Sequence, residues 1–315
     1  MKVVVLGGSG FLGSHVSDAL TEAGHEVLIF DIKHSPYLRP GQQMVVGDIL
    51  DERAVEDSVQ GASVVYNFAG IADIAEASQR PIDSVKFNIL GNSIVLEACR
   101  KAGVKRFVFA SSLYVYSKAG SFYRSTKQAC ELLIENYHEV FGLSYTILRY
   151  GSLYGPRADK KNAIYNFVKQ AIASGKIIRH GDGEELREYI HVLDAAKGSC
   201  EILSDEFANQ YVILTGQQQM RIKDLLIMIN EMLDNKVTVE FAPANESYHY
   251  EITPFSFAPR VGKRLTGKTY LDLGQGILDI IYSVYREVNP FPIVNGIVLN
   301  DSMQAVDGQA PQKIS

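Results

Sequence analysis

The sequence predicts an α/β protein, a doubly wound parallel sheet (a Rossmann arrangement) followed by a smaller mixed α/β domain. Apolar, β-prone runs alternate with helical stretches over about the first 155 residues. The runs are almost wholly apolar, as expected for parallel strands that helices cover on both faces. A glycine-rich turn follows the first run, at the place where such sheets bind phosphate groups. After Pro156 the alternation loosens. We therefore expect a first domain at 1–157, a second at 158–286 partly interleaved with it, and a tail at 287–315.

The first thirty-one residues predict a strand–helix–strand unit. The apolar run Val3–Leu6 leads into a turn and a helix start, and a second strand, Glu26–Phe30, ends at Asp31. The turn contains Gly7, Gly10 and Gly13. Glycines let backbone N–H groups approach a dinucleotide pyrophosphate, and an acid about 20 residues further on accepts a ribose hydroxyl. Three glycines can equally make a tight turn under a core helix, but the flanking strand, helix and acid favour dinucleotide binding.

Further strands and helices are predicted from the same alternation of patterns. The strands are Ser63–Phe68, Arg106–Ser112, Ser144–Tyr150, Arg187–Val192 and Gln210–Leu214. The helices are Ala54–Gln60, Ile82–Ala102, Tyr123–Phe141, Asn162–Ser174, Leu193–Leu203 and Ile222–Leu233.

Composition narrows the functional classes. The net charge is −5 and no basic block occurs, which argues against nucleic acid or an anionic membrane as the main partner. Cys99, Cys130 and Cys200 lack metal-ligand spacing, and their odd number argues against a disulfide framework. No apolar run reaches the ~18 residues that span a bilayer. We expect a cytoplasmic protein without a bound metal.

Three side chains form a candidate catalytic group. The strand Arg106–Ser112 ends in two hydroxyls, at the sheet edge where ligands bind. Tyr123 and Lys127 are four residues apart and so lie on one face of a helix, where the ammonium stabilises a phenolate. A Tyr–Lys pair at this spacing often occurs by chance. Beside Ser112 and a nucleotide site, however, it makes a device for moving a proton and a hydride.

The chain resembles the extended short-chain dehydrogenases/reductases of the nucleotide-sugar epimerase and dehydratase family. The likeness covers roughly residues 1–200 and is weaker to about 285. Besides the glycines and Asp31, it rests on Gly47-Asp48-Ile49, Phe68-Ala69-Gly70, Pro81 with Asn88, Ser111-Ser112 before Val115-Tyr116, Tyr123-x-x-x-Lys127, Arg149-Tyr150, Tyr154-Gly155-Pro156 and Arg187-Glu188-Tyr189-Ile190-His191-Val192.

The resemblance implies roles for individual residues. Ser112, Tyr123 and Lys127 would be catalytic. NAD would be bound by Gly7, Gly10, Phe11, Leu12, Gly13, Asp31, Asp48, Ile49, Phe68, Ala69, Gly70, Asn88, Tyr123, Lys127 and Tyr150. The substrate would contact Ser112, Tyr123, Ser152, Arg187 and Arg260. Asp31 favours NAD over NADP because a carboxylate repels a 2′-phosphate, although nearby Lys33 weakens this preference.

Three departures from the family pattern bear on the substrate. Leu113 and Tyr114 occupy the places of the acid pair found in family dehydratases, so elimination of water is not expected. Ser152 stands where the family has an asparagine. The connection between Ser112 and Tyr123 is shorter than is usual in extended members, and Lys118–Phe122 is what remains of a loop that normally borders the sugar.

Several roles stay open at the level of sequence. Arg187 would hold a substrate diphosphate or form a surface ion pair with Glu184, and Arg260 would contact substrate or be structural. Tyr248, His249 and Tyr250 would touch a substrate or form a packed aromatic turn. The apolar segment Phe291–Val294 of the tail would dock on a surface or, as we rather expect, be disordered.

The sequence therefore predicts an NAD-dependent nucleotide-sugar 4-epimerase that acts through a transient 4-keto sugar, with Tyr123 moving the proton of the 4-hydroxyl. The alternatives are a reductase of a 4-keto nucleotide sugar, which uses the same residues, and a non-catalytic protein that senses a nucleotide. The helices near 82–102 and 123–141 resemble the pair that forms the family's dimer interface, so we expect a homodimer.

Overall fold

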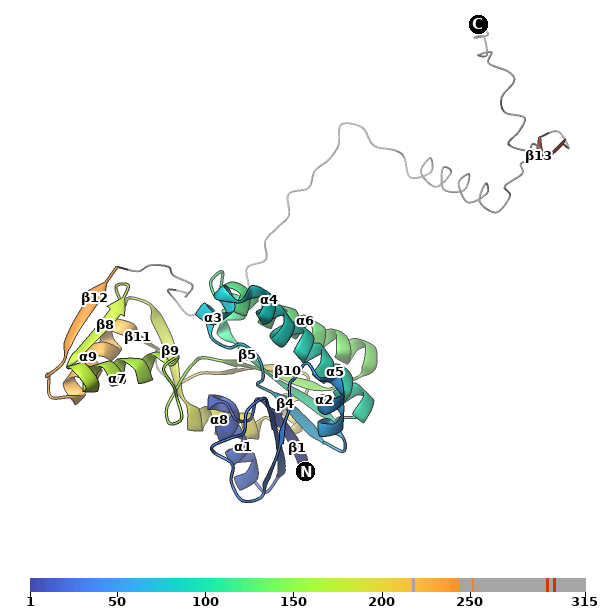
Figure 1. The fold of residues 1–315 in the computed structure, drawn as a ribbon, viewed down its shortest axis with the longest axis horizontal. Helices are drawn as coiled ribbons and strands as arrows, with labels where there is room; N and C mark the ends of the chain where they lie inside the picture. Colours follow the sequence, from blue (N-terminus) through green and yellow to red (C-terminus); the bar gives the residue numbers. More distant parts are fainter. Residues whose placement is uncertain (217–218, 244–250, 252–292, 295–296, 299–315) are drawn as a thin grey trace, which may run out of the picture. The chain divides into compact units, whose positions relative to one another are not determined.

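The computed structural model describes residues 1–216, 219–243, 251, 293–294 and 297–298 (Figure 1). The chain divides into two compact units, Met1–Ala258 and Pro259–Ser315. In the second unit, β13 (Ile293–Val294) pairs antiparallel with β14 (Ile297–Val298). The predicted contacts at Tyr248, His249, Tyr250 and Arg260 lie outside the described residues.

The first unit is built on a parallel sheet of seven strands in the order β10-β6-β5-β4-β1-β2-β3. The strands are β1 (Lys2–Leu6), β2 (Glu26–Asp31), β3 (Gln42–Val46), β4 (Val64–Asn67), β5 (Arg106–Ser112), β6 (Tyr145–Tyr150) and β10 (Gln210–Leu214). The doubly wound fold predicted from the sequence is confirmed. The sequence analysis missed β3, because this edge strand is half exposed and lacks a continuous apolar run.

Helices cover both faces of this sheet (Figure 1). On one face α2 (Glu52–Val59), α5 (Gly91–Ala102) and α6 (Ser121–Phe141) pack over the sheet, and α1 (Phe11–Glu22) and α8 (Val192–Glu201) pack over the other. The predicted helix at 82–102 is α4 (Pro81–Ser84), a π-helical turn (Val85–Leu90) and α5 in succession. The short α3 (Ile74–Gln79) precedes α4.

A smaller group of elements follows β6. It contains β7 (Ser152–Tyr154), α7 (Ala163–Ser174), β8 (Lys176–His180), β9 (Leu186–His191), β11 (Gln219–Arg221), α9 (Ile222–Met232) and β12 (Thr238–Ala242). β9 pairs with both β7 and β11, and β8 pairs with β12. Between these elements the chain returns to the large sheet, since α8 packs on α1 and β10 adds next to β6. Within the described residues no helix is both long and apolar enough to cross a membrane.

Candidate active site

The turn between β1 and α1 is close-packed against the neighbouring strand end. Gly7 has φ +76°, and a Cβ there would lie 2.6 Å from the backbone nitrogen of Ala69. A Cβ on Gly13 would lie 2.2 Å from the carbonyl oxygen of Gly7. Because only glycine fits at these two positions, the backbone forms a cradle directly before the N-terminus of α1, where a phosphate group is favoured.

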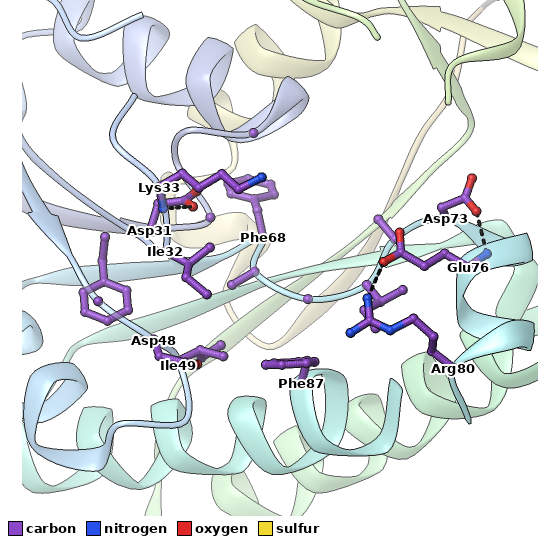
Figure 2. Close-up of a pocket in the computed structure, with 18 of the residues that line it drawn as sticks. Asp31, Ile32, Lys33, Asp48, Ile49, Phe68, Asp73, Glu76, Arg80 and Phe87 are labelled. Atoms are coloured by element: carbon purple, nitrogen blue, oxygen red, sulfur yellow. Dashed lines mark hydrogen bonds and ion pairs between the residues drawn. The ribbon is translucent and has the colours of Figure 1, made fainter. Parts of the chain in front are cut away.

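Asp31 at the end of β2 is fixed in place. Its Oδ2 accepts a hydrogen bond from the backbone nitrogen of Ser9 at 3.0 Å, and its Oδ1 accepts one from that of Lys33 at 3.1 Å. Figure 2 shows Asp31 and Lys33 on one wall of a groove, with Asp48, Ile49 and Phe87 on the opposite wall. Two N–H donors hold the carboxylate, so it presents a defined acceptor for a ribose hydroxyl.

The groove has a volume of about 520 Å³ and brings together most of the residues that the sequence assigned to the cofactor. Of those residues, Gly7, Gly10, Asp31, Asp48, Ile49, Phe68, Ala69 and Gly70 line it. Phe11, Leu12 and Gly13 form the first turn of α1, which starts directly after Gly10. The groove extends past Ile71 to Asp73, Glu76 and Arg80, residues that the sequence did not single out.

Asn88 and Tyr150 do not line this groove. The buried Asn88 side chain accepts a hydrogen bond from the backbone nitrogen of Ile71 at 2.7 Å and donates to Thr126 Oγ1 at 3.0 Å, so it holds the loop that follows β4. Tyr150 lies in the core on the face that α8 covers, and its hydroxyl is 2.6 Å from Ser199 Oγ. Burial raises the pKa of Tyr150. The alternation of side chains along β6 turns Tyr150 toward α8 and away from the groove.

The three candidate catalytic side chains come from β5 and α6. Lys127 is 7% exposed, and its Nζ donates to the carbonyl oxygen of Ala110 at 2.6 Å. The same Nζ lies 5.8 Å from the centre of the Tyr123 ring, as the i, i+4 spacing predicts. Burial lowers the pKa of Lys127. Ser112 is the last residue of β5, and Tyr123 packs in one cluster with Ile71 and Ile74.

Ile71 and Ile74 belong to two different hollows, which meet here. Ile71 lines the groove, and Ile74 lines a second cavity of about 320 Å³. Ala72, Asp73 and Lys161 line both. Tyr123 packs against Ile71 and Ile74 beside this junction, but it lines neither hollow itself, and neither do Ser112 and Lys127.

Three cationic side chains line the second cavity, and two of them are in ion pairs. Arg187 and Ser152, both predicted from the sequence, line it together with Arg179 and Lys161, which were not. Arg179 is paired with Glu185 at 2.5 Å, and Lys161 with Glu76 at 2.5 Å. Neither cation lies in a sequence motif. The tertiary fold brings each of them to the cavity. The carboxylate of Glu184 pairs with Lys223 and Arg221, so its described ion pairs are with these residues rather than with Arg187.

A buried ion pair supports the end of β5, and the sequence analysis missed it. Glu131 pairs with Arg149 at 2.6 Å and accepts a hydrogen bond from Ser111 Oγ, also at 2.6 Å. Glu131 follows Lys127 by four residues, so it continues the helix face that begins at Tyr123. That spacing, together with Arg149 beside Tyr150, was the signal that could have identified it.

Comparisons with known proteins identify the family of the chain. Residues 3–213 match the model of the NAD dependent epimerase/dehydratase family. The UDP-glucose 4-epimerase of Corynebacterium glutamicum is 26% identical over 275 residues, which cover 77% of this chain and 84% of that protein. The structure of UDP-glucose 4-epimerase with UDP-glucose from Thermotoga maritima has a TM-score of 0.76 at 25% identity, and the match covers 82% of this chain and 90% of that one. The NAD complex of the Thermus thermophilus UDP-glucose 4-epimerase has a TM-score of 0.74 at 25% identity, covering 84% and 95%.

Proposed function

The chain belongs to the NAD-dependent epimerase/dehydratase family, as its motifs predicted, and from this premise we propose that it is a nucleotide-sugar 4-epimerase that keeps NAD bound through turnover. One observation carries the proposal. Tyr123, beside the buried Lys127, packs against Ile71 and Ile74, the first of which lines the groove and the second the neighbouring cavity. A phenol next to this junction could exchange a proton with a sugar hydroxyl placed next to a nicotinamide.

The groove fits NAD. Side chains cannot be accommodated at Gly7 and Gly13, so the backbone there is bare and suits a pyrophosphate. The Asp31 carboxylate suits a ribose that has no 2′-phosphate. Asp48, Ile49, Phe68, Ala69 and Gly70 would line the adenine and nicotinamide channel. When bound, NAD supplies a nicotinamide that accepts a hydride from the sugar carbon and later returns it.

The protein's own groups would move the proton and hold the sugar. Tyr123 Oη would take the proton of the 4-hydroxyl and return it after the sugar has presented its other face. Lys127 would orient the phenol and contact the nicotinamide ribose, while its Nζ stays fixed on the carbonyl of Ala110. The Ser112 hydroxyl would hydrogen-bond the same sugar oxygen and hold it near Tyr123.

The cavity suits a nucleotide diphosphate. Among the described residues that line it, Arg179, Arg187 and Lys161 are cationic, and Asp73 is the carboxylate. Arg187 would grip the diphosphate, since its forked donors match phosphate oxygens, and Ser152 would contact the sugar side. The family neighbours with UDP-glucose support UDP-sugars as the first substrates to try.

We further propose a cytoplasmic homodimer. Apolar side chains are exposed on α4, the π-helical turn and α6, and include Ile82 (68%), Leu90 (51%), Leu132 (61%) and Val140 (69%). Pairing these helices between two copies would cover them. The three free cysteines suit a reducing compartment. Light scattering that finds only monomers would contradict the dimer.

We also propose residues 1–157 as the cofactor domain, 158–286 as the substrate domain and 287–315 as a tail.

The function is tested with purified protein and a panel of UDP-sugars, without added cofactor. We expect NAD to be released when the protein is denatured, and one 4-epimer pair to interconvert. Tyr123→Phe should lower kcat by about 10²–10⁴-fold with unchanged NAD content, because it removes the proton carrier alone. Tyr137→Phe removes a hydroxyl from the same helix, which contacts Glu97 outside the site, and serves as the matched control.

Two outcomes would contradict this proposal. Stoichiometric consumption of NADH or NADPH with a 4-keto nucleotide sugar would instead identify a reductase that uses the same residues. Unchanged turnover in Tyr123→Phe would remove the phenol from the mechanism.

A further inference from the structure

Tyr114 contacts both of the candidate catalytic hydroxyl residues. It lies two residues after Ser112, in a short 3₁₀ turn (Leu113–Tyr116), and its backbone N–H donates to Ser112 Oγ at 3.3 Å. Its ring meets that of Tyr123 edge to face, with centroids 6.2 Å apart and planes at 79°. This separation is in the range where aromatic rings attract each other in a fixed orientation. One residue thus contacts the Ser112 hydroxyl and the Tyr123 ring.

The short connection between β5 and α6 fixes the position of the Tyr114 ring. Gly120 has φ +96°, and a Cβ there would lie 2.7 Å from Tyr114 Cδ1. The connection is in turn held by α6, since Arg124 donates to the carbonyl of Ser117 at 3.2 Å and Gln128 to that of Val115 at 2.7 Å. The ring of Tyr114 is therefore confined between the backbone of Gly120 and the ring of Tyr123.

The spacing of these contacts along α6 couples the connection to the site. Arg124 and Gln128 directly follow Tyr123 and Lys127, so the helix carries two i, i+4 pairs on adjacent faces. One pair holds the connection and the other forms the candidate catalytic group. In this way the helix fixes the place of Tyr114 relative to Tyr123.

Tyr114 also lines the second cavity, together with Arg187 and Tyr189. We infer that Tyr114 is a positioning residue for the proposed epimerisation, and the inference rests on that proposed function. Its ring holds the Tyr123 phenol beside the junction of groove and cavity, and its backbone orients Ser112. The aromatic ring carries this role, because the contacts with Gly120 and Tyr123 are made by ring atoms.

The test compares Tyr114→Ala with Tyr114→Phe in the full-length protein loaded with NAD. A misplacement of about 1 Å can cost a reaction 10²-fold, so we expect Tyr114→Ala to lower kcat by roughly 10–100-fold. KM for the nucleotide sugar should change less than about 3-fold and NAD content should stay at the wild-type level, since groove and diphosphate contacts remain. Tyr114→Phe should recover most of the lost kcat. The control is Phe141→Ala, which removes a ring from the Tyr137–Phe141 pair, with centroids 5.3 Å apart, at the far end of α6.

Gly120→Ala gives an independent check, because it displaces the Tyr114 ring without changing it. We expect it to lower kcat in the same direction as Tyr114→Ala. Wild-type kcat in Tyr114→Ala would overturn the inference, and so would a loss in Tyr114→Phe as large as that in Tyr114→Ala. If the wild-type protein turns over no nucleotide sugar, the proposed function itself fails, which is distinct from an active wild type with an unaffected Tyr114→Ala.

Discussion

The large sheet and the smaller group of elements after β6 differ in how they are buried. In the sheet, β4 is buried at all four of its residues and β1 at four of its five. In the smaller group, β8 has one buried residue among its five and β12 has none, and among the described residues a cluster around Leu226 forms the core. The cofactor groove draws almost wholly on the first region, whereas the cavity draws on both. If the proposed function holds, NAD binding should depend on the sheet, and substrate binding on the less buried region as well.

The largest expected effect comes from replacing one buried leucine with alanine in each core. Leu148 on β6 and Leu226 on α9 are both fully buried. Each change to alanine should cost about 2–5 kcal/mol of local stability. Leu148→Ala should lower the free energy of unfolding and the NAD content together. Leu226→Ala should weaken nucleotide-sugar binding, measured by calorimetry, at wild-type NAD content. Release of NAD from Leu226→Ala would contradict the division between the two regions.

A smaller effect is expected from Asp31→Asn in the groove. A hydrogen bond to a charged group contributes about 1.5–3 kcal/mol, so NAD affinity should fall roughly 10–100-fold. The preference for NAD over NADP should narrow, because the amide does not repel a 2′-phosphate. Fluorescence titration of both cofactors measures this. Asp57→Asn, an exposed acid on α2, is the matched control. An unchanged NAD to NADP ratio would remove Asp31 from cofactor selection.

The smallest effect concerns a contact between α1 and the segment after β7. His15 Nε2 is 2.9 Å from the carbonyl oxygen of Pro156, and burial lowers the pKa of His15 below its usual 6.5. A depressed pKa in the folded state means that the unfolded chain binds the proton more tightly. The contribution of His15 is therefore complete above pH 6.5 and is lost as the pH falls from there through the folded-state pKa. Wild-type Tm should fall between pH 7.5 and 5.5, and His15→Gln should make this fall smaller, by an amount that corresponds to less than about 1 kcal/mol of unfolding free energy. His34→Gln, at an exposed histidine, should leave the fall in Tm unaltered.

Much of the first region could be predicted from the sequence because its determinants are local. Strand runs, the glycine turn and the Tyr123–Lys127 spacing are patterns within a few residues. The edge strand β3 escaped prediction because exposure on one side removes its apolar run. Tyr150 was assigned to the cofactor from a motif, while the pleat of β6 directs it to Ser199 in the core.

The sequence by itself determined the glycine cradle, the Asp31 acceptor and the helix face shared by Tyr123 and Lys127, because spacing along one strand or helix sets them. Only the tertiary structure decided what surrounds the second cavity. Lys161 reaches Glu76 across 85 positions of the chain, and Arg179 lines a cavity that no motif marks. The contact between the Tyr114 ring and Gly120 could not be predicted from the sequence either. It depends on the three-dimensional course of the turn, which produces no periodic pattern of residues.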